Sequence, residues 1–285
     1  MNRRTFLSTL GLAAAGTQIA CAPRMASTTT GTRRLRRVGI QLYTLRDDAR
    51  RDLAGTLVNI ARTGYKEVEL LGSMNNFGMA PERLRAILDQ NGLTAPSTHV
   101  DVNVFDDLQR QIDIAKVLGH QYLIVASLPD GEKLGPDDYR RWADRFNEAG
   151  SRALRSGMRI GFHDEKWDFR KVNGQVLYDL FAERTDPSLV WLQLDTGNAA
   201  IGGADPLDYM KRYGNRYWLF HIKDAPAIGA TDDTELGKGT IDFRRLLSMI
   251  DRIDEKHLYV EQETYPGAPL DSVRRDYAYI STLEF

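Results

Sequence analysis

Four short segments in the second half of the chain each run from apolar residues into side chains that can bind a metal ion. They are GFHDE (residues 161–165), LQLDTGN (192–198), FHIKD (220–224) and YVEQE (259–263). Each begins as a buried strand does and ends in histidine, aspartate, glutamate or lysine. A parallel barrel produces this pattern, because the carboxyl ends of its strands meet at one pocket. The segments therefore predict a divalent metal at the mouth of a (β/α)8 barrel.

The spacing within these segments predicts which side chains share a face. Successive residues of a strand point to opposite sides, so residues two apart point the same way. The resulting pairs are His163 with Glu165, Gln193 with Asp195, His221 with Lys223, Glu261 with Glu263, Glu67 with Glu69, and Ser97 with His99. If the last residues of each strand point inward, four consecutive strands bring imidazole or carboxylate groups to one place.

Such a cluster of carboxylates would repel itself unless a cation neutralised it. Mixed carboxylate and imidazole ligands suit manganese, cobalt, iron, zinc or magnesium. A single carboxylate at a strand end is more often a helix cap or an ion-pair partner. Four such strand ends in succession favour a shared metal site.

The elements that must position these residues alternate strictly along the chain. The expected strands are residues 38–43, 67–71, 95–100, 122–126, 158–163, 189–195, 217–222 and 258–262. The expected helices are residues 51–63, 81–90, 106–118, 136–156, 172–185, 206–213, 243–253 and 270–283. The strands are apolar runs, as expected for parallel strands buried on both faces. An open doubly wound sheet alternates in the same way, but no glycine-rich phosphate fingerprint follows the first strand. Eight units in 285 residues favour a closed (β/α)8 barrel, with residues 223–242 as a lid over its mouth.

The composition narrows the class of partner. The chain has 38 lysines and arginines against 39 aspartates and glutamates, whereas a dedicated nucleic-acid binder is usually basic. We therefore expect a small carbohydrate as substrate and no nucleic-acid partner. The single cysteine excludes an internal disulfide, and no apolar run after residue 36 is long enough for a membrane helix. The sequence leaves a homo-oligomer open.

The N-terminus is expected to be an export signal and not part of the fold. Arg3 and Arg4 form a twin-arginine pattern, followed by an apolar stretch over residues 10–20. The signal would span residues 1–26, the linker 27–36 and the single barrel domain 37–285. Cleavage before Cys21 would leave a lipid-anchored protein, whereas cleavage near Ala22 or Ala26 would release a soluble periplasmic one.

Five motifs carry a family resemblance. They are GFHDEKWDF (161–169), LDTGNAAIGGADP (194–206), LFHIKD (219–224), ELGKGTIDF (235–243) and YVEQETYP (259–266). Together they resemble the sugar phosphate isomerase/epimerase family of xylose isomerase-like barrels, from about residue 36 to the end of the chain. The motifs are specific for the family and not for a substrate.

The resemblance implies one metal ion held by groups from the last four strands. Carried over to this chain, the ligands would be Asp195, His221, Glu261 and a group from strand five. Many family members place glutamate on strand five. This chain offers His163 as the favoured ligand, with Glu165 as a base or an alternative ligand. The chain departs from the family segment in having Glu165 where a second histidine usually stands and Asp168 where a glutamate stands.

The resemblance also implies proton abstraction beside a carbonyl group, through an enediolate. Glu165, Glu261 and Glu263 are the candidate proton carriers. Lys223 would stabilise the developing oxyanion or pair with Glu261 or Glu263.

Three further residues are expected to contact the substrate or support the site. His99 would touch substrate hydroxyls or be a buried structural histidine. Trp167 would stack on a sugar face or pack at the barrel rim. Glu69 would orient the inner residues of the site or pair with an arginine.

The expected activity is that of an exported sugar isomerase or epimerase that depends on one divalent ion (Mn, Co, Mg or Zn). Its substrate would be a free sugar or keto-sugar, and the same site could run elimination or hydration on a 3-keto-glycoside. One alternative is a metal-dependent hydrolase of the endonuclease IV type, which needs three metals and more histidines than the five present. The other alternative is a non-catalytic periplasmic sugar-binding barrel.

Overall fold

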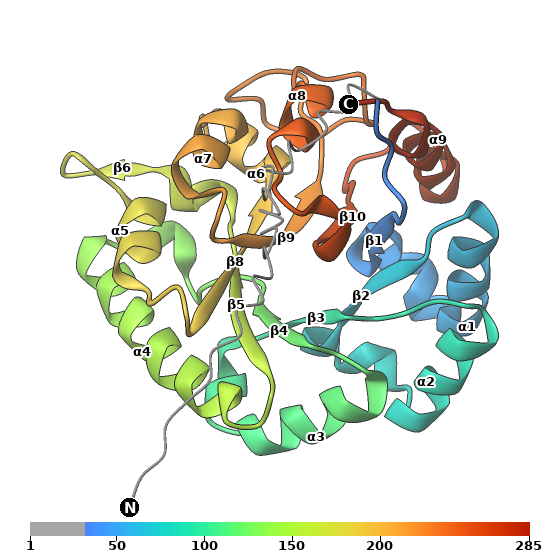
Figure 1. The fold of residues 1–285 in the computed structure, drawn as a ribbon, viewed down its shortest axis with the longest axis horizontal. Helices are drawn as coiled ribbons and strands as arrows, with labels where there is room; N and C mark the ends of the chain where they lie inside the picture. The colour runs from blue at the N-terminus through green and yellow to red at the C-terminus, as the bar shows by residue number, and fades with distance from the viewer. Residues whose placement is uncertain (1–31) are drawn as a thin grey trace, which may run out of the picture. The chain divides into compact units, whose positions relative to one another are not determined.

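Eight parallel strands close into a ring in the order β1-β10-β9-β8-β5-β4-β3-β2. The structure is a computed structural model, and it describes residues 32–285. The strands are β1 Gly39–Gln41, β2 Glu67–Leu71, β3 Ser97–Val100, β4 Tyr122–Val125, β5 Arg159–His163, β8 Val190–Asp195, β9 Tyr217–Ile222 and β10 His257–Val260. Helices surround this ring (Figure 1). The (β/α)8 barrel predicted from the sequence is confirmed.

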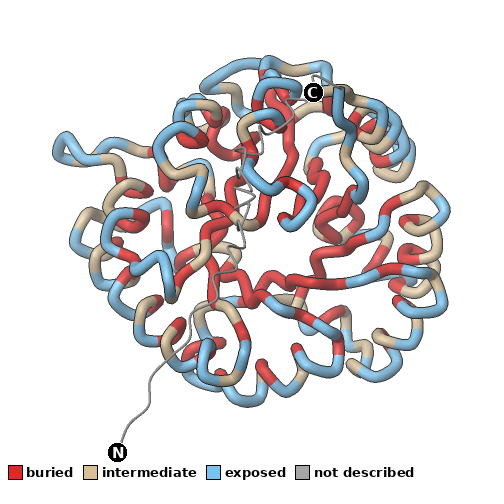
Figure 2. The backbone as a smooth tube through the Cα atoms, in the orientation of Figure 1, coloured by how far each residue is buried: buried red, intermediate tan, exposed pale blue. Residues whose placement is uncertain are grey.

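The helices follow the strands and cover the outside of the barrel. In the described part of the chain they are α1 Arg46–Thr63, α2 Pro81–Gln90, α3 Leu108–Leu118, α4 Pro136–Leu154, α5 Leu177–Arg184, α6 Thr196–Ile201, α7 Pro206–Tyr213, α8 Phe243–Ser248 and α9 Pro269–Thr282. Four of them begin with proline, whose fixed φ and missing N–H suit the first helical turn. The buried residues lie along the strands and on the inner faces of these helices (Figure 2).

Several element boundaries differ from the expected ones. Residues 171–176 form a small hairpin of β6 (Lys171–Val172) and β7 (Gln175–Val176), where a helix from residue 172 was expected. Its turn residues Asn173 and Gly174 have φ values of 51° and 81°, as an Asn-Gly hairpin turn requires. The first helix begins at residue 46 instead of 51, and α8 ends at residue 248 instead of 253. The short helix α6 was not expected at all.

The segment between β9 and α8, expected as a lid, is held in place by two carboxylates. The carboxylate of Asp224 accepts hydrogen bonds from the backbone N–H groups of residues 225, 237, 239 and 241. Asp233 accepts from the N–H groups of Glu263 and Thr264, which follow β10. The bonds of Asp224 lie within the segment, whereas those of Asp233 tie it to the residues after β10 and would break if the segment opened.

The barrel unit spans Arg33–Phe285. Its two ends are tied to each other, because the backbones of Arg33 and Phe285 exchange two hydrogen bonds of 2.9 and 3.0 Å. Residues 33–36, expected as the end of a linker, therefore adjoin the last residues of the barrel. The predicted export signal, its cleavage sites and the linker up to residue 31 lie outside the described residues. Among the helices of residues 32–285, none is long and apolar enough to cross a membrane.

Candidate active site

Four buried side chains from neighbouring strands converge at the carboxyl end of the barrel. His163 ends β5, Asp195 ends β8, His221 lies near the end of β9, and Glu261 follows β10. These strands are consecutive in the ring. One ligand atom from each residue lies within 4.8 Å of the other three. The structure thus brings together the four residues predicted as metal ligands.

The four converging atoms lack hydrogen-bond partners. They are Nε2 of His163, Oδ2 of Asp195, Nδ1 of His221 and Oε2 of Glu261. Buried polar side-chain atoms are normally hydrogen-bonded, whereas the two carboxylate oxygens here have an ion-pair partner, Nζ of Lys223, at 3.0 and 3.2 Å. Nδ1 of His221 lies 2.7 Å from Oε2 of Glu261, yet the pair does not have the geometry of a hydrogen bond. The four atoms lie close enough together to be the ligands of one cation.

In three of these side chains, the second polar atom, which does not belong to the cluster, forms a hydrogen bond elsewhere in the protein. Nδ1 of His163 lies 2.9 Å from the carbonyl oxygen of Ala126. Oδ1 of Asp195 accepts from the backbone N–H groups of residues 197 and 198. Nε2 of His221 lies 2.5 Å from Oε2 of Glu69. Such outer contacts fix the tautomer and orientation of a metal ligand, so these residues fit a divalent cation.

Glu69 lies beneath the site and is fully buried. Its carboxylate accepts hydrogen bonds from Gln41, Ser97 and Gln193 in addition to His221, and these donors come from four other strands. Burial alone raises the pKa of this carboxyl group, but His99, His221 and the hydrogen bonds outweigh it and hold the pKa at about 2. Glu69 is therefore a permanent anion that orients His221. It does not line the cavity.

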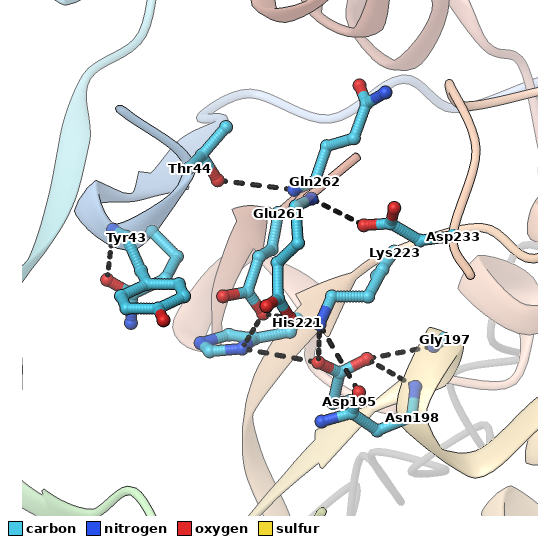
Figure 3. A network of polar contacts seen from close by, with 12 residues as sticks. Tyr43, Thr44, Asp195, Gly197, Asn198, His221, Lys223, Asp233, Glu261 and Gln262 are labelled. Carbon is cyan, nitrogen blue, oxygen red and sulfur yellow. Dashed lines mark hydrogen bonds and ion pairs between the residues drawn. The ribbon is translucent and has the colours of Figure 1, made fainter. Parts of the chain in front are cut away.

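Lys223 supplies a positive charge to the cluster. Its Nζ lies 3.0 Å from Oδ2 of Asp195 and 3.2 Å from Oε2 of Glu261 (Figure 3). It also lies 2.6 Å from Oε1 of Glu263. Burial lowers the pKa of this ammonium group, but the three carboxylates raise it well above its usual value. The predicted ion pair is therefore present, and the ammonium group faces the cavity as a hydrogen-bond donor.

Glu165 lies on the cavity wall, two residues beyond His163. Burial raises the pKa of its carboxyl group to about 8, although His163 and Lys223 act in the opposite direction. Its backbone N–H donates to Asp168, which also accepts from the hydroxyl group of Tyr139. A carboxyl group that titrates near neutral pH suits general acid–base chemistry.

A cavity of about 450 Å³ opens above the cluster. His99, Trp167 and Glu263, predicted as site residues, all line it. Nε2 of His99 lies 2.9 Å from Oε1 of Gln193. The indole nitrogen of Trp167 is packed so closely on Gly131 that a Cβ atom there would lie 2.3 Å from it.

Sequence reasoning missed two residues that shape the site. Asn198 lines the cavity, and its Oδ1 lies 3.3 Å from Nζ of Lys223. It lies on α6, and Asp195 caps that helix. Because Asn198 follows this cap by three residues, the sequence could have placed it in the first turn of a helix at the barrel mouth. Asp164 is fully buried and accepts from the backbone N–H of Asp195. Burial raises the pKa of the Asp164 carboxyl group well above its usual value.

Comparison with known proteins gives relatives for both sequence and fold. A family model described as the xylose isomerase-like TIM barrel matches residues 57–283. An inosose dehydratase from Geobacillus kaustophilus is 27% identical over 192 residues, which cover 59% of this chain and 60% of the relative. The chain thus matches less than two thirds of that relative's length.

Solved structures resemble almost the whole barrel. A sugar phosphate isomerase/epimerase from Parabacteroides distasonis is 25% identical with a TM-score of 0.75, over 90% of this chain and 98% of that one. The IolI protein with a bound zinc atom is 15% identical with a TM-score of 0.66, over 85% of this chain and 95% of that one. At 15% identity the likeness concerns the fold alone.

Proposed function

The chain belongs to the family of xylose isomerase-like TIM barrels, and on this premise we propose that it is a divalent-metal-dependent enzyme that removes a proton beside the carbonyl group of a sugar. The observation that carries the proposal is that four buried ligand atoms without a hydrogen bond lie within 4.8 Å of one another. The substrate would be a free sugar or a keto-sugar. The product would follow from where the proton is returned or which group is lost.

The residues that would hold the ion are His163, Asp195, His221 and Glu261. Two imidazoles and two carboxylates suit zinc, manganese or cobalt, and magnesium less well. When bound, the ion would polarise a carbonyl group and stabilise the negative charge that develops on it. Nearby carboxylates raise the pKa values of His221 and Lys223. The site therefore stabilises positive charge, which supports the binding of a cation there.

The side chains around the ion would move the protons. Glu165, in its carboxylate form, would take the proton from the carbon beside the carbonyl group and leave an enediolate. Its pKa of about 8 allows it to hold that proton near neutral pH and to return it. The ammonium group of Lys223 would donate a hydrogen bond to the developing oxyanion. Glu263, paired with Lys223 at 2.6 Å, is the second proton carrier.

Three reactions share this first step. Return of the proton to the neighbouring carbon gives isomerisation, and return to the opposite face of the same carbon gives epimerisation. Loss of a hydroxyl group or glycosidic oxygen from the next carbon gives elimination, and its reverse gives hydration. The inosose dehydratase relative supports the elimination route, and the sugar phosphate isomerase/epimerase neighbour supports the other two.

The alternatives have less support. A hydrolase of the endonuclease IV type needs three metals. In residues 32–285 the two candidate ligand groups share His163 and His221, so they describe one site. A sugar-binding barrel without catalysis would not require a carboxyl group with a pKa near neutrality on the cavity wall.

Deuterium exchange tests the proposal. The metal content of the purified protein is measured first, and candidate keto-sugars are then incubated with it in D2O. We expect deuterium at the carbon beside the carbonyl group, and no exchange with His221→Ala, which should also lose the ion. Turnover without carbon-bound deuterium, with ¹⁸O from water entering a cleaved bond, would reject the enediolate route in favour of hydrolysis.

A further inference from the structure

The cavity has a charged half and an uncharged half. Every aspartate, glutamate and lysine that lines it follows β5, β9 or β10. The opposite half follows β1 to β4, which are also consecutive in the ring. In the described chain, that half of the cavity is lined by Tyr43, Leu71, Met74 and Ala126, together with Ser73, Ser127 and His99. It contains no aspartate, glutamate, lysine or arginine.

The segment that contributes Ser73 and Met74 to the uncharged half has a rare backbone conformation. Within the 3-10 turn Gly72–Gly78, residues Asn75, Asn76 and Phe77 have φ values of 49°, 44° and 55°. Left-handed φ values are uncommon outside glycine, and for a bulky residue such as phenylalanine they are outliers. Such conformations persist where the surroundings fix them, often at binding sites. Phe77 packs against the core and Asn76 is buried, so the turn presents Met74 from a fixed wall.

Tyr43, on the neighbouring strand end, is also held in place. The guanidinium group of Arg46 lies 4.5 Å from the centre of the Tyr43 ring and donates to the Tyr43 carbonyl oxygen. The side-chain carbonyl oxygen of Gln41 accepts from the Tyr43 backbone N–H. These contacts orient an aromatic ring at the cavity before any ligand arrives, which lowers the entropic cost of binding.

We propose that the uncharged half binds an apolar substituent on the substrate, namely the aromatic aglycone of a glycoside, while the sugar ring lies over the metal-ligand half. The inference rests on the proposed function, which assigns the sugar to the ligand half. A cavity of about 450 Å³ falls in the usual range of about 300–1,000 Å³ for sites that bind drug-sized molecules. The uncharged half offers a phosphate group no cation, and in the other half the two lysines, Lys166 and Lys223, lie among five carboxylates, where like charges oppose binding.

Binding measurements on the full-length protein test the subsite without turnover. The probes are 4-nitrophenyl β-D-glucopyranoside, methyl β-D-glucopyranoside and glucose 6-phosphate, titrated by calorimetry. We expect the nitrophenyl glucoside to bind about tenfold more tightly than the methyl glucoside, as one buried ring contact allows. Glucose 6-phosphate should bind most weakly. Equal affinity for the two glucosides, or binding of neither at millimolar concentration, would overturn the subsite.

Substitutions in the turn Gly72–Gly78 and at its end test whether the preference for the nitrophenyl glucoside arises in the uncharged half. Met74→Ala should reduce the affinity for the nitrophenyl glucoside about tenfold and leave that for the methyl glucoside unchanged. Met79→Ala is the matched control, because Met79 ends the same turn but does not line the cavity. Met74→Lys, a second variant, should also remove the aryl preference by placing a charge in this half. An aryl preference that survives both Met74 variants would contradict the assignment.

Failure of this inference and failure of the proposed function look different. If unsubstituted keto-sugars exchange deuterium as fast as keto-glycosides with an aryl group, the subsite is wrong and the function stands. If the aryl glucoside binds preferentially but no keto-sugar exchanges deuterium, the subsite stands and the function is wrong.

Discussion

In the candidate ligand residues, different polar atoms of one side chain have different tasks. Nε2 of His221 contacts Glu69, and Nδ1 lies 2.7 Å from Oε2 of Glu261, among the candidate ligand atoms. Because Glu69 stays ionised at any moderate pH, it holds a proton on Nε2 and leaves Nδ1 for the cation. The carboxylate beneath the site thus determines which nitrogen of His221 faces it.

We therefore predict that Glu69→Gln weakens metal binding without removing a ligand. Loss of the charged acceptor should cost about 10- to 100-fold in affinity for zinc, the range found for such outer contacts. Competition with a chelator dye would measure it. Glu67→Gln is the matched control, because Glu67 lies on the same strand but pairs with His257 at the other end of the barrel. Unchanged affinity in Glu69→Gln would show that the strands alone orient His221.

A second prediction separates the base from the ligand on strand five. Glu165→Gln should retain the ion and slow deuterium exchange about 10²- to 10⁴-fold, the usual contribution of a general base. Metal analysis and exchange rates on the same preparation would decide. Loss of the ion in this variant would instead make Glu165 the ligand and His163 a substrate contact.

At the scale of elements, the sequence predicted that the candidate ligand residues converge, because the alternation of side chains along a strand and burial on both faces leave little choice. When the last residues of an apolar strand include two polar side chains that point to the same face, those side chains lie at the barrel mouth. His163, Asp195 and His221 follow that rule. The sequence could not show how far below the barrel mouth each inward-pointing side chain lies. Glu69 and His99 share the barrel interior, yet only His99 reaches the cavity. The distance of a side chain from the barrel mouth depends on strand tilt and register, and the spacing of residues along one strand does not reveal either.

The errors in the elements also have local causes. Helical periodicity continued through residues 172–176 and hid the hairpin, although Asn173-Gly174 is a strong turn signal. The helix α6 has only six residues, which is too short for periodicity to reveal. Its cap, Asp195, was assigned to the metal, and the structure shows that one oxygen caps the helix while the other lies among the candidate ligand atoms, 3.0 Å from Nζ of Lys223.

A third prediction concerns Asp276 on α9, which fastens the segment between β9 and α8. Its Oδ1 accepts from the backbone N–H of Leu236, and its buried Oδ2 has no partner. Burial raises the pKa of this carboxyl group to about 7. The folded state therefore binds a proton that the unfolded state releases near pH 4. The stability contributed by Asp276 is present below that pH and is lost as the pH rises to about 7.

Asp276→Asn should consequently be more stable than the parent protein at pH 8, by about 1–3 kcal/mol, the cost of an unsatisfied buried polar group. At pH 4 the difference should be close to zero. Denaturant unfolding of both proteins at the two pH values measures it. The exposed Asp271→Asn, on the same helix, should show no such pH dependence. A difference that does not vary with pH would contradict the assignment.

At the scale of the whole molecule, the charges are balanced overall but not locally. The formal net charge is −1, yet the acidic residues gather on one half of the cavity. A net charge this close to zero gives little overall attraction for charged ligands. Substrate selection must therefore occur within the cavity, which agrees with a neutral carbohydrate better than with a phosphorylated one.

The last prediction concerns where such an enzyme works. Free sugars and glycosides are available outside the cytoplasm, and the predicted twin-arginine signal would take the barrel there. Because the export receptor reads the arginine pair, Arg3→Lys combined with Arg4→Lys should hold the precursor in the cytoplasm, as cell fractionation would measure. Radiolabelled palmitate, with Cys21→Ser as control, would separate a lipid-anchored product from a released one. Normal periplasmic accumulation of the double variant would show that residues 1–26 are not a twin-arginine signal.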